Sequence, residues 1–232
     1  MTPEPEGKDQ TRGRDWRRRF IAENTAINSP PHVPELTLHL ASEAFDLWHK
    51  TEEELEEIGL PPPFWAFAWA GGQALARYIL DNPHIVSGKH VADIGSGSGL
   101  VAIASMKAGA AGATAIDVDA FALEAADVNA ALNGVSIVVR RGNEGDSFPD
   151  LPPETGVLLL GDVFYDRRLA PAMVALARSS LEKGRAVFVG DPGRAYVPDA
   201  AMLEELALYE VQVPTALEDQ EVRKCRVFRF VG

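Results

Sequence analysis

The feature that most constrains the fold is a loop with three glycines, Gly95, Gly97 and Gly99, set between two apolar segments. Residues 91–94 are predicted to form a short buried strand, and residues 100–108 a helix of small apolar residues. Glycine suits such a loop because it permits a positive φ and lets a ligand approach the backbone closely. Ligands of open α/β sheets bind beyond the carboxyl ends of the strands, so the loop predicts a binding site there.

Strands and helices are expected to alternate along the rest of the chain. Predicted strands cover residues 91–94, 113–116, 136–140, 157–160, 186–189, 209–213 and 226–231, and predicted helices cover 73–80, 100–108, 121–133, 170–181 and 199–206. This alternation predicts a doubly wound, Rossmann-like α/β sheet of seven strands that is mostly parallel. The last two strands have no helix between them, which predicts one antiparallel strand at the C-terminus.

The domain organisation follows from where apolar residues begin. Residues 1–15 have almost nothing to bury and are predicted to be a disordered tail. Residues 16–232 are predicted to form a single domain. Within that domain, residues 16–80 are interpreted as an N-terminal extension that includes a segment covering the ligand, and residues 89–232 as the Rossmann-like core.

Two patterns inside the extension predict local structure. Alternation over residues 36–40 favours a short strand, and the apolar spacing over residues 45–58 favours helical turns. Five arginines between residues 12 and 19 are interpreted as an exposed basic helix. A transit peptide is the alternative, but such peptides are poor in acidic residues and four lie close to these arginines.

The charge and the cysteine content restrict the possible partners. Lys plus Arg number 22 and Asp plus Glu 34, so the formal net charge is −12. A chain this acidic is a poor general binder of phosphate backbones, and we expect neither a nucleic acid nor a membrane as partner. The single Cys225 excludes a disulfide and favours a reducing compartment, here the cytoplasm. The five histidines have no metal-ligand spacing, and we expect no metal site.

Two acidic residues lie where a nucleotide-like ligand would be bound. Asp93 stands two residues before Gly95, where a carboxylate suits the ammonium of a methionine moiety and would repel a pyrophosphate. Asp117 ends the next predicted strand, where it can accept hydrogen bonds from ribose hydroxyls. The alternative is a tight turn from strand to helix with an aspartate as helix cap. The residues assigned to S-adenosylmethionine on this basis are Asp93, Gly95, Ser96, Gly97, Gly99 and Asp117.

Further cofactor contacts are expected from the ends of other elements. Trp69 and Gly71 lie just before a predicted helix, and Trp69 is the best candidate to cover the cofactor. Trp65 and Phe67, in the same aromatic run, can equally be core residues. Asn143 follows the third strand, where the adenine amine would be met, although an ordinary turn explains it as well.

The acceptor side is expected to follow the fourth and fifth strands. Asp162 is interpreted as a catalytic residue that also faces the cofactor, because it can align an acceptor nitrogen and stabilise positive charge on it. Tyr165 is assigned a catalytic role as a hydrogen-bond partner or a wall of the acceptor channel. The alternative is that Asp162 caps the next helix and the aromatic residues pack. The substrate-side residues are Phe164, Asp191 and Arg194.

Four segments together resemble one known family. They are residues 62–78, PPFWAFAWAGGQALARY; the loop Asp93–Gly99; residues 161–166, GDVFYD; and residues 190–194, GDPGR. Over about residues 20–232 the chain resembles the electron transfer flavoprotein β-subunit lysine methyltransferases, within the seven-β-strand protein methyltransferases. The aromatic run and the Asp-x-Phe-Tyr segment are more specific to that family than the glycine loop is.

The resemblance implies transfer of methyl groups from S-adenosylmethionine to lysines of the electron transfer flavoprotein β subunit, up to three per lysine. It implies a protein partner, and we expect a monomer that is a bacterial, cytoplasmic member. Related enzymes methylate ribosomal proteins, which leaves a second substrate open. Methylation of a nucleic acid or small molecule, and non-catalytic binding of S-adenosylmethionine, are the remaining alternatives. The acidic turn Gly142–Asp150 departs from the family pattern.

Overall fold

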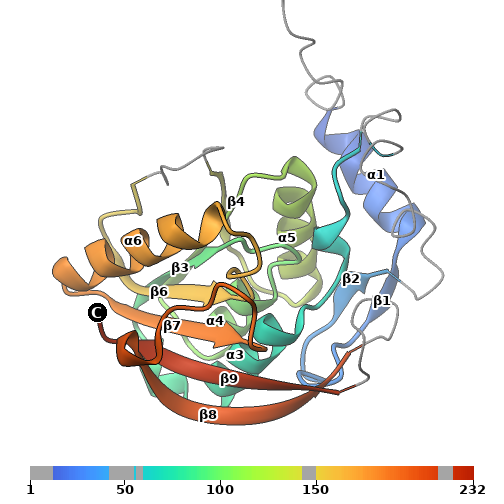
Figure 1. Cartoon of the computed structure of the whole chain (residues 1–232). Helices are drawn as coiled ribbons and strands as arrows, with labels where there is room; N and C mark the ends of the chain where they lie inside the picture. The colour runs from blue at the N-terminus through green and yellow to red at the C-terminus, as the bar shows by residue number, and fades with distance from the viewer. Residues whose placement is uncertain (1–12, 42–54, 56–59, 143–149, 214–221) are drawn as a thin grey trace, which may run out of the picture.

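The centre of the molecule is a seven-stranded sheet, seen in a computed structural model that describes residues 13–41, 55, 60–142, 150–213 and 222–232 (Figure 1). Its strands are β3 (His90–Ile94), β4 (Gly112–Asp117), β5 (Val138–Arg141), β6 (Thr155–Gly161), β7 (Ala186–Asp191), β8 (Leu203–Gln212) and β9 (Val222–Phe230). The order is β5-β4-β3-β6-β7-β9-β8. β9 is antiparallel to both β7 and β8, so it alone runs in the direction opposite to the other six strands. The predicted mostly parallel sheet with one antiparallel C-terminal strand is therefore confirmed.

Helices cover both faces of the sheet, as the apolar strands require. The main helices are α3 (Ala70–Asp81), α4 (Leu100–Lys107), α5 (Ala120–Leu132) and α6 (Leu169–Glu182). Along β6, Val157 and Leu159 pack in the cluster that contains α3 and α4, while Leu158 and Leu160 pack in the cluster that contains α6. Successive side chains of a strand point to opposite faces, so this central strand is buried on both sides.

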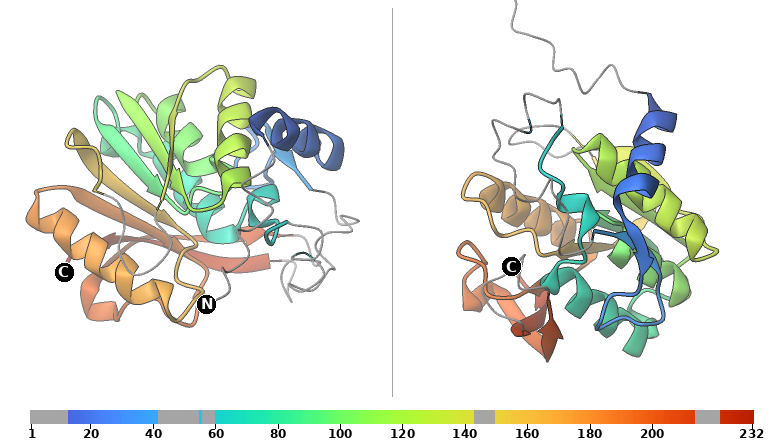
Figure 2. Two further views of the ribbon diagram at one scale, coloured as in Figure 1. Left: turned by 90° about the horizontal axis from the view of Figure 1, so that it is seen from above. Right: turned by 90° about the vertical axis from the view of Figure 1, so that its right-hand side faces the viewer.

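The N-terminal extension lies along the edge of this core. It contains α1 (Arg14–Asn24), the antiparallel pair β1 (Ala26–Asn28) and β2 (Leu38–Leu40), and the 3₁₀ turn η3 (Phe64–Ala66). Two further 3₁₀ turns are η4 (Pro83–Ile85) and η5 (Ala200–Met202). The predicted strand near residue 38 and the predicted basic helix are confirmed. However, α1 packs beside α5 (Figure 2) and buries Ile21, so it is more than an exposed helix.

Two asparagines, Asn129 in α5 and Asn133 at its C-cap, hold the extension by hydrogen bonds to its backbone. The side chain of Asn133 accepts from Thr37 N at 3.0 Å and donates to Thr37 O at 2.6 Å. The side chain of Asn129 accepts from His39 N at 2.7 Å and donates to Ser98 O, in the glycine loop, at 2.9 Å. Asn129 is fully buried and thus connects the extension to the glycine loop.

One predicted helix is wrong. Residues 199–206 were expected to be helical, but only Ala200–Met202 form a 3₁₀ turn and β8 begins at Leu203. The register of β8 against β9 shifts between Glu205 and Ala207. This irregularity interrupts the two-residue alternation and leaves Met202, Leu203 and Leu206 at helix-like spacing.

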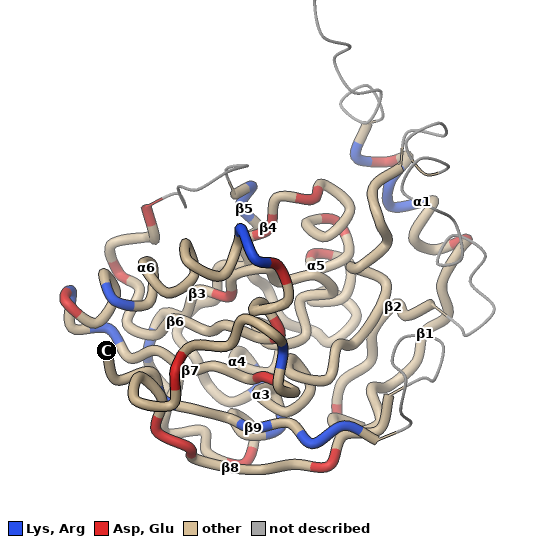
Figure 3. Tube along the Cα trace, viewed as in Figure 1, with Lys and Arg blue, Asp and Glu red and all other residues tan. Residues whose placement is uncertain are grey.

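Some sequence-based predictions lie outside the described residues. These are the tail over residues 1–12, nearly all of the helical turns over 45–58, and residues 143–149 of the acidic turn. Charged residues are distributed over the described chain, with acidic residues along β8 beside basic residues along β9 (Figure 3). Among the described helices, none has the length and apolar character needed to cross a membrane.

Candidate functional site

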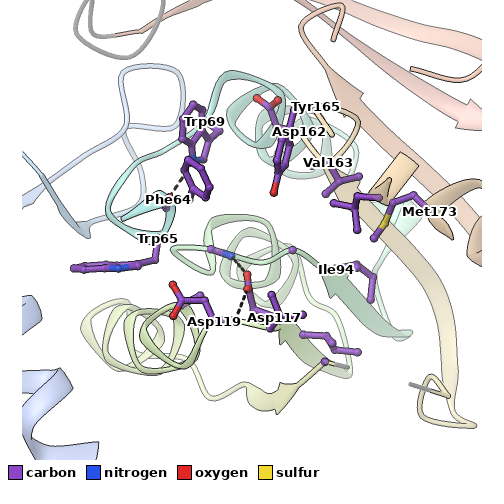
Figure 4. Close-up of a pocket in the computed structure, with 18 of the residues that line it drawn as sticks. Phe64, Trp65, Trp69, Ile94, Asp117, Asp119, Asp162, Val163, Tyr165 and Met173 are labelled. Atoms are coloured by element: carbon purple, nitrogen blue, oxygen red, sulfur yellow. Dashed lines mark hydrogen bonds between the residues drawn. The ribbon is translucent and has the colours of Figure 1, made fainter. Parts of the chain in front are cut away.

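The carboxyl ends of β3, β4 and β6 surround a pocket of about 520 Å³ (Figure 4). This volume falls within the range of small-molecule sites, roughly 300–1,000 Å³. Residues from the extension, from α5 and from α6 complete its walls. The predicted site residues that line it are Trp69, Gly95, Gly97, Asp117, Asp162, Tyr165 and Arg194.

The glycine loop forms the floor of this pocket in a conformation that demands glycine. Gly95, Gly97 and Gly99 have φ values of 64°, 50° and 80°. A Cβ at Gly99 would lie 2.9 Å from Ala126, so the loop also packs directly on α5. Ser96 Oγ, between these glycines, is buried and has no hydrogen-bond partner within the described part of the chain. The loop is therefore built for close backbone approach and leaves one polar atom available to a ligand.

The two predicted acidic residues differ in where they lie. Asp117 lines the pocket, and its carboxylate accepts from Gly97 N at 2.9 Å and from Asp119 N at 3.0 Å. Asp93 is only 2% exposed, and its Oδ2 accepts from Ala102 N at 3.1 Å in the first turn of α4. Burial raises the pKa of Asp93 to about 7. Asp93 thus supports the helix that follows the loop, and its contact with a ligand stays a prediction.

Asp162 occupies a conformation that the surrounding structure imposes. Among the described residues it is the one non-glycine with a positive φ, at 62°. Its backbone N–H donates to Gly190 O at 2.8 Å, and its Oδ2 accepts from Gly71 N at 2.8 Å. Its Oδ1 accepts from Arg194 Nε at 2.6 Å. A strained residue held by three contacts at a pocket wall is typical of functional sites.

The alternative in which Asp162 caps the following helix is wrong. Asp166 performs that task, because its Oδ1 accepts from Arg168 N at 2.7 Å and from Leu169 N at 3.0 Å at the start of α6. Asp162 is therefore free of any capping role and directs its carboxylate toward Gly71 and Arg194.

Aromatic side chains form one side of the pocket mouth. Phe64 lies 5.8 Å from Trp69 and 6.1 Å from Tyr165, measured between ring centroids. The Arg194 guanidinium lies 5.8 Å from the centre of the Trp69 ring. Figure 4 shows Phe64, Trp69 and Tyr165 opposite Asp117 across the pocket. This side of the mouth can shield a reacting group from water while it keeps the carboxylate of Asp162 within reach.

The remaining predicted residues do not line the pocket or lie outside the described residues. A Cβ at Gly71 would lie 2.4 Å from Gly190 O, so Gly71 allows α3 to approach the end of β7. Asp191 is 1% exposed and holds the loop that carries Arg194. Phe164 is fully buried in the α6 cluster, and the exposed position after β6 belongs to its neighbour Tyr165. Asn143 lies outside the described residues.

Sequence reasoning missed the aliphatic part of the pocket lining, here called the apolar slot. It is formed by Ile94, Val118, Val163, Leu169 and Met173. Phe64 at the mouth was quoted in the aromatic run but was given no role. Single aliphatic residues carry no chemical signal in a sequence. Their position, one or two residues from a strand end, was the available clue for Val118 and Val163.

Comparisons with known proteins identify methyltransferases that are similar to this chain. The family model for ribosomal protein L11 methyltransferase (PrmA) matches residues 74–148. An electron transfer flavoprotein beta subunit lysine methyltransferase from Xenopus laevis is 37% identical over 220 residues, covering 92% of this chain and 86% of the relative. The enzyme of the same name from Rattus norvegicus is 34% identical over 226 residues, covering 92% of this chain and 84% of the relative.

A solved structure extends the likeness to the fold. A proposed RNA methyltransferase from Pyrococcus horikoshii superposes with a TM-score of 0.51 at 13% identity, covering 94% of this chain and 95% of that one. Fold and site together thus define an S-adenosylmethionine-dependent methyltransferase of the Rossmann-like class. More particularly, the chain belongs to the electron transfer flavoprotein beta subunit lysine methyltransferase family.

The residues present fit the cofactor of this class. The apolar slot beside Val118 and Met173 suits a purine ring, and the carboxylate of Asp117 keeps acceptor capacity for ribose hydroxyls. The buried Ser96 Oγ, which lacks a partner among the described residues, offers a further polar contact beside the loop. The described residues contain no group of three or more His, Cys, Asp and Glu that could hold a metal ion.

Proposed function

We propose that this enzyme methylates lysine side chains of the electron transfer flavoprotein β subunit. The observation that carries the proposal is the carboxylate of Asp162, held at the pocket wall by Gly71 and Arg194 beside the aromatic mouth. Support comes also from relatives with that substrate in their name, which align with most of the chain.

The cofactor supplies a methyl group on a sulfonium; a bond from lysine nitrogen to the methyl carbon forms as the carbon–sulfur bond breaks. The amine must be neutral to attack, and at pH 7 free lysine requires about 5 kcal/mol for deprotonation. In this proposal Asp162 accepts a hydrogen bond from the amine and stabilises the positive charge that develops on it. Phe64, Trp69 and Tyr165 exclude water and orient the lysine chain, which gives the advantage of proximity.

Ribosomal protein L11 is the second candidate substrate, because the PrmA family model matches this chain. That match covers residues 74–148, from α3 to beyond β5, and so includes the glycine loop and Asp117. It excludes Asp162, Tyr165 and Arg194, which lie on the proposed acceptor side. The match therefore supports the cofactor more than it supports this acceptor.

Methyl transfer to purified proteins tests the proposal. The enzyme is incubated with labelled S-adenosylmethionine and either the β subunit or ribosomal protein L11, and modified peptides are identified by mass spectrometry. We expect label on lysines of the β subunit and at least a hundredfold loss with Asp162→Asn, which keeps the shape of the side chain. Label only on L11, or on RNA from a lysate, would refute the substrate. Full activity of Asp162→Asn would refute the role of the carboxylate.

A further inference from the structure

The guanidinium of Arg194 lies directly against the carboxylate of Asp162, which is proposed to meet the acceptor amine. Arg194 Nε donates to Asp162 Oδ1 at 2.6 Å, and the guanidinium lies over the Trp69 ring. The side chains of Arg194 and Asp162 are only 18% and 3% exposed. Arg194 lines the pocket as Asp162 does, so this ion pair is part of the pocket wall.

The loop after β7 is built to hold Arg194 in this position. Asp191 Oδ1 accepts from Gly193 N at 2.6 Å and from Arg194 N at 2.7 Å. Gly193 has a φ of 88°, which favours glycine there. Asp191 itself is buried at the end of β7, where it pairs in register with Arg226 of β9. The backbone of Arg194 is thus held by a hydrogen bond to Asp191, which is itself part of the sheet.

Apart from Arg194, the charged or titratable residues that line the pocket are acidic: Asp117, Asp119, Asp162 and Tyr165. Asp166 interacts electrostatically with Tyr165, and Asp191 at the end of β7 does so with Asp162. Burial raises the pKa of Tyr165, and the carboxylates of Asp117, Asp166 and Asp162 raise it further. Without Arg194 the pocket would present a negative field, which favours the cationic form of an entering lysine.

We propose that Arg194 keeps the acceptor lysine uncharged in the site by cancelling the charge of Asp162. The carboxylate can then orient the amine through a hydrogen bond without holding it as an unreactive ammonium. Arg194 acts through Asp162 and is therefore a positioning residue. This inference rests on the proposed lysine acceptor, although it does not depend on which protein carries that lysine.

The pH dependence of a single turnover tests the proposal. Methylation of the β subunit is followed from pH 6 to pH 10 with the wild type, Arg194→Gln, Arg194→Lys and Arg178→Gln. Removing the positive charge should raise the pKa of the bound lysine, so the midpoint of Arg194→Gln should move to higher pH by about one unit or more. Arg194→Lys should stay near the wild type. Arg178 is an exposed arginine on α6 outside the pocket, and its variant should not move the midpoint.

A binding measurement gives a second readout that does not depend on turnover. Calorimetry in buffers of different ionisation enthalpy counts the protons released when the β subunit binds the enzyme loaded with S-adenosylhomocysteine. At pH 8 the wild type should release more protons than Arg194→Gln. An unchanged midpoint together with equal proton release would overturn the proposal, even if Arg194→Gln is slower.

A wrong substrate assignment can be distinguished from a wrong role for Arg194, because it already shows in the labelling pattern of the wild type. If the wild type labels another protein, that protein replaces the β subunit in the same pH series. Affinity for S-adenosylhomocysteine and the melting temperature of each variant show whether the pocket remains folded. If Arg194→Gln does not fold, Arg194→Ala is compared with the double variant Arg194→Ala/Asp162→Asn. In this double variant both charges are removed, so the midpoint should return toward that of the wild type, and a persisting alkaline shift would contradict the mechanism.

Discussion

Asp93 shows how a buried carboxyl couples the stability of the cofactor loop to pH. Burial raises its pKa to about 7, whereas an aspartate in an unfolded chain titrates at about 3.9. Between these values the native state binds a proton that the unfolded state has released. The contribution of this group to the free energy of unfolding therefore falls as the pH rises from about 4 to about 7.

The variant Asp93→Asn cannot ionise but keeps an oxygen that can accept from Ala102 N. Between pH 5 and pH 8, about two pH units of this interval are crossed, so we expect the wild type to lose up to about 3 kcal/mol more of its free energy of unfolding than this variant. Urea unfolding at both pH values measures the difference. Asp191, whose pKa burial raises to about 6, is present in both proteins and cancels in the comparison. Parallel curves for the two proteins would contradict the prediction.

Gly190 is a residue whose role is steric. A Cβ there would lie 2.2 Å from Gly71 O and 2.7 Å from Leu75 Cβ, so Gly190→Ala must push α3 away from β7. We expect a loss of about 3 kcal/mol or more, as for severe overpacking. Gly156→Ala on β6 is the matched control, because its Cβ would meet its nearest neighbour at 3.8 Å. Urea unfolding of the two variants should separate them clearly, and similar losses would argue against the close approach.

At the scale of elements, the docking of α1 on α5 combines aromatic packing with ion pairs. Phe121 is 1% exposed, and its ring lies 5.8 Å from Trp16, 5.4 Å from Phe20 and 5.6 Å from Trp65. Phe121→Ala should cost about 3–5 kcal/mol, as for other buried phenylalanines. Arg18→Ala removes partly exposed pairs with Glu124 and Asp127, but Arg14 still pairs with both carboxylates, so the cost should be less than about 1 kcal/mol. Thermal unfolding compares the two, and a larger loss for Arg18→Ala would reverse this assignment.

The elements also show why part of the fold could be predicted and part could not. The parallel strands β3 and β6 are short apolar runs buried on both faces, and such runs are recognisable in a sequence. The irregularity in β8 gave its residues helix-like spacing, so that strand was partly mistaken for a helix. The contacts of Asn129 and Asn133 with the extension join residues about 90 positions apart, which no local pattern indicates.

The candidate site could likewise be predicted only in part from the sequence. Asp117, Asp162 and the glycine loop could be predicted, because charged residues and glycines at strand ends carry a chemical meaning. The contact between Arg194 and Asp162 could not be predicted, since it depends on how the loops after β6 and β7 face each other. The apolar slot was missed because Leu169 and Met173 lie near the start of α6, where they look like ordinary core residues of a helix.

At the scale of the whole molecule, the net charge of −12 has a consequence for stability. Repulsion among excess carboxylates destabilises the compact state, and salt screens it, because the Debye length falls from about 30 Å at 0.01 M to about 8 Å at 0.15 M. Exposed pairs such as Arg226 with Glu205 and Arg229 with Glu204 are each worth less than about 1 kcal/mol, so screening them costs little. Repulsion should therefore dominate the response to salt.

We accordingly expect the melting temperature at pH 8 to rise by a few degrees between 0.01 M and 0.2 M sodium chloride. At pH 5 some of the 34 carboxylates bind protons, so the net charge is smaller and the rise should shrink or vanish. Thermal unfolding at the two pH values and two salt concentrations gives the four numbers needed. If the melting temperature at pH 8 fell with salt, local ion pairs would outweigh the overall repulsion. The pairs that bind α1 to α5 would then have to contribute more than their exposure suggests.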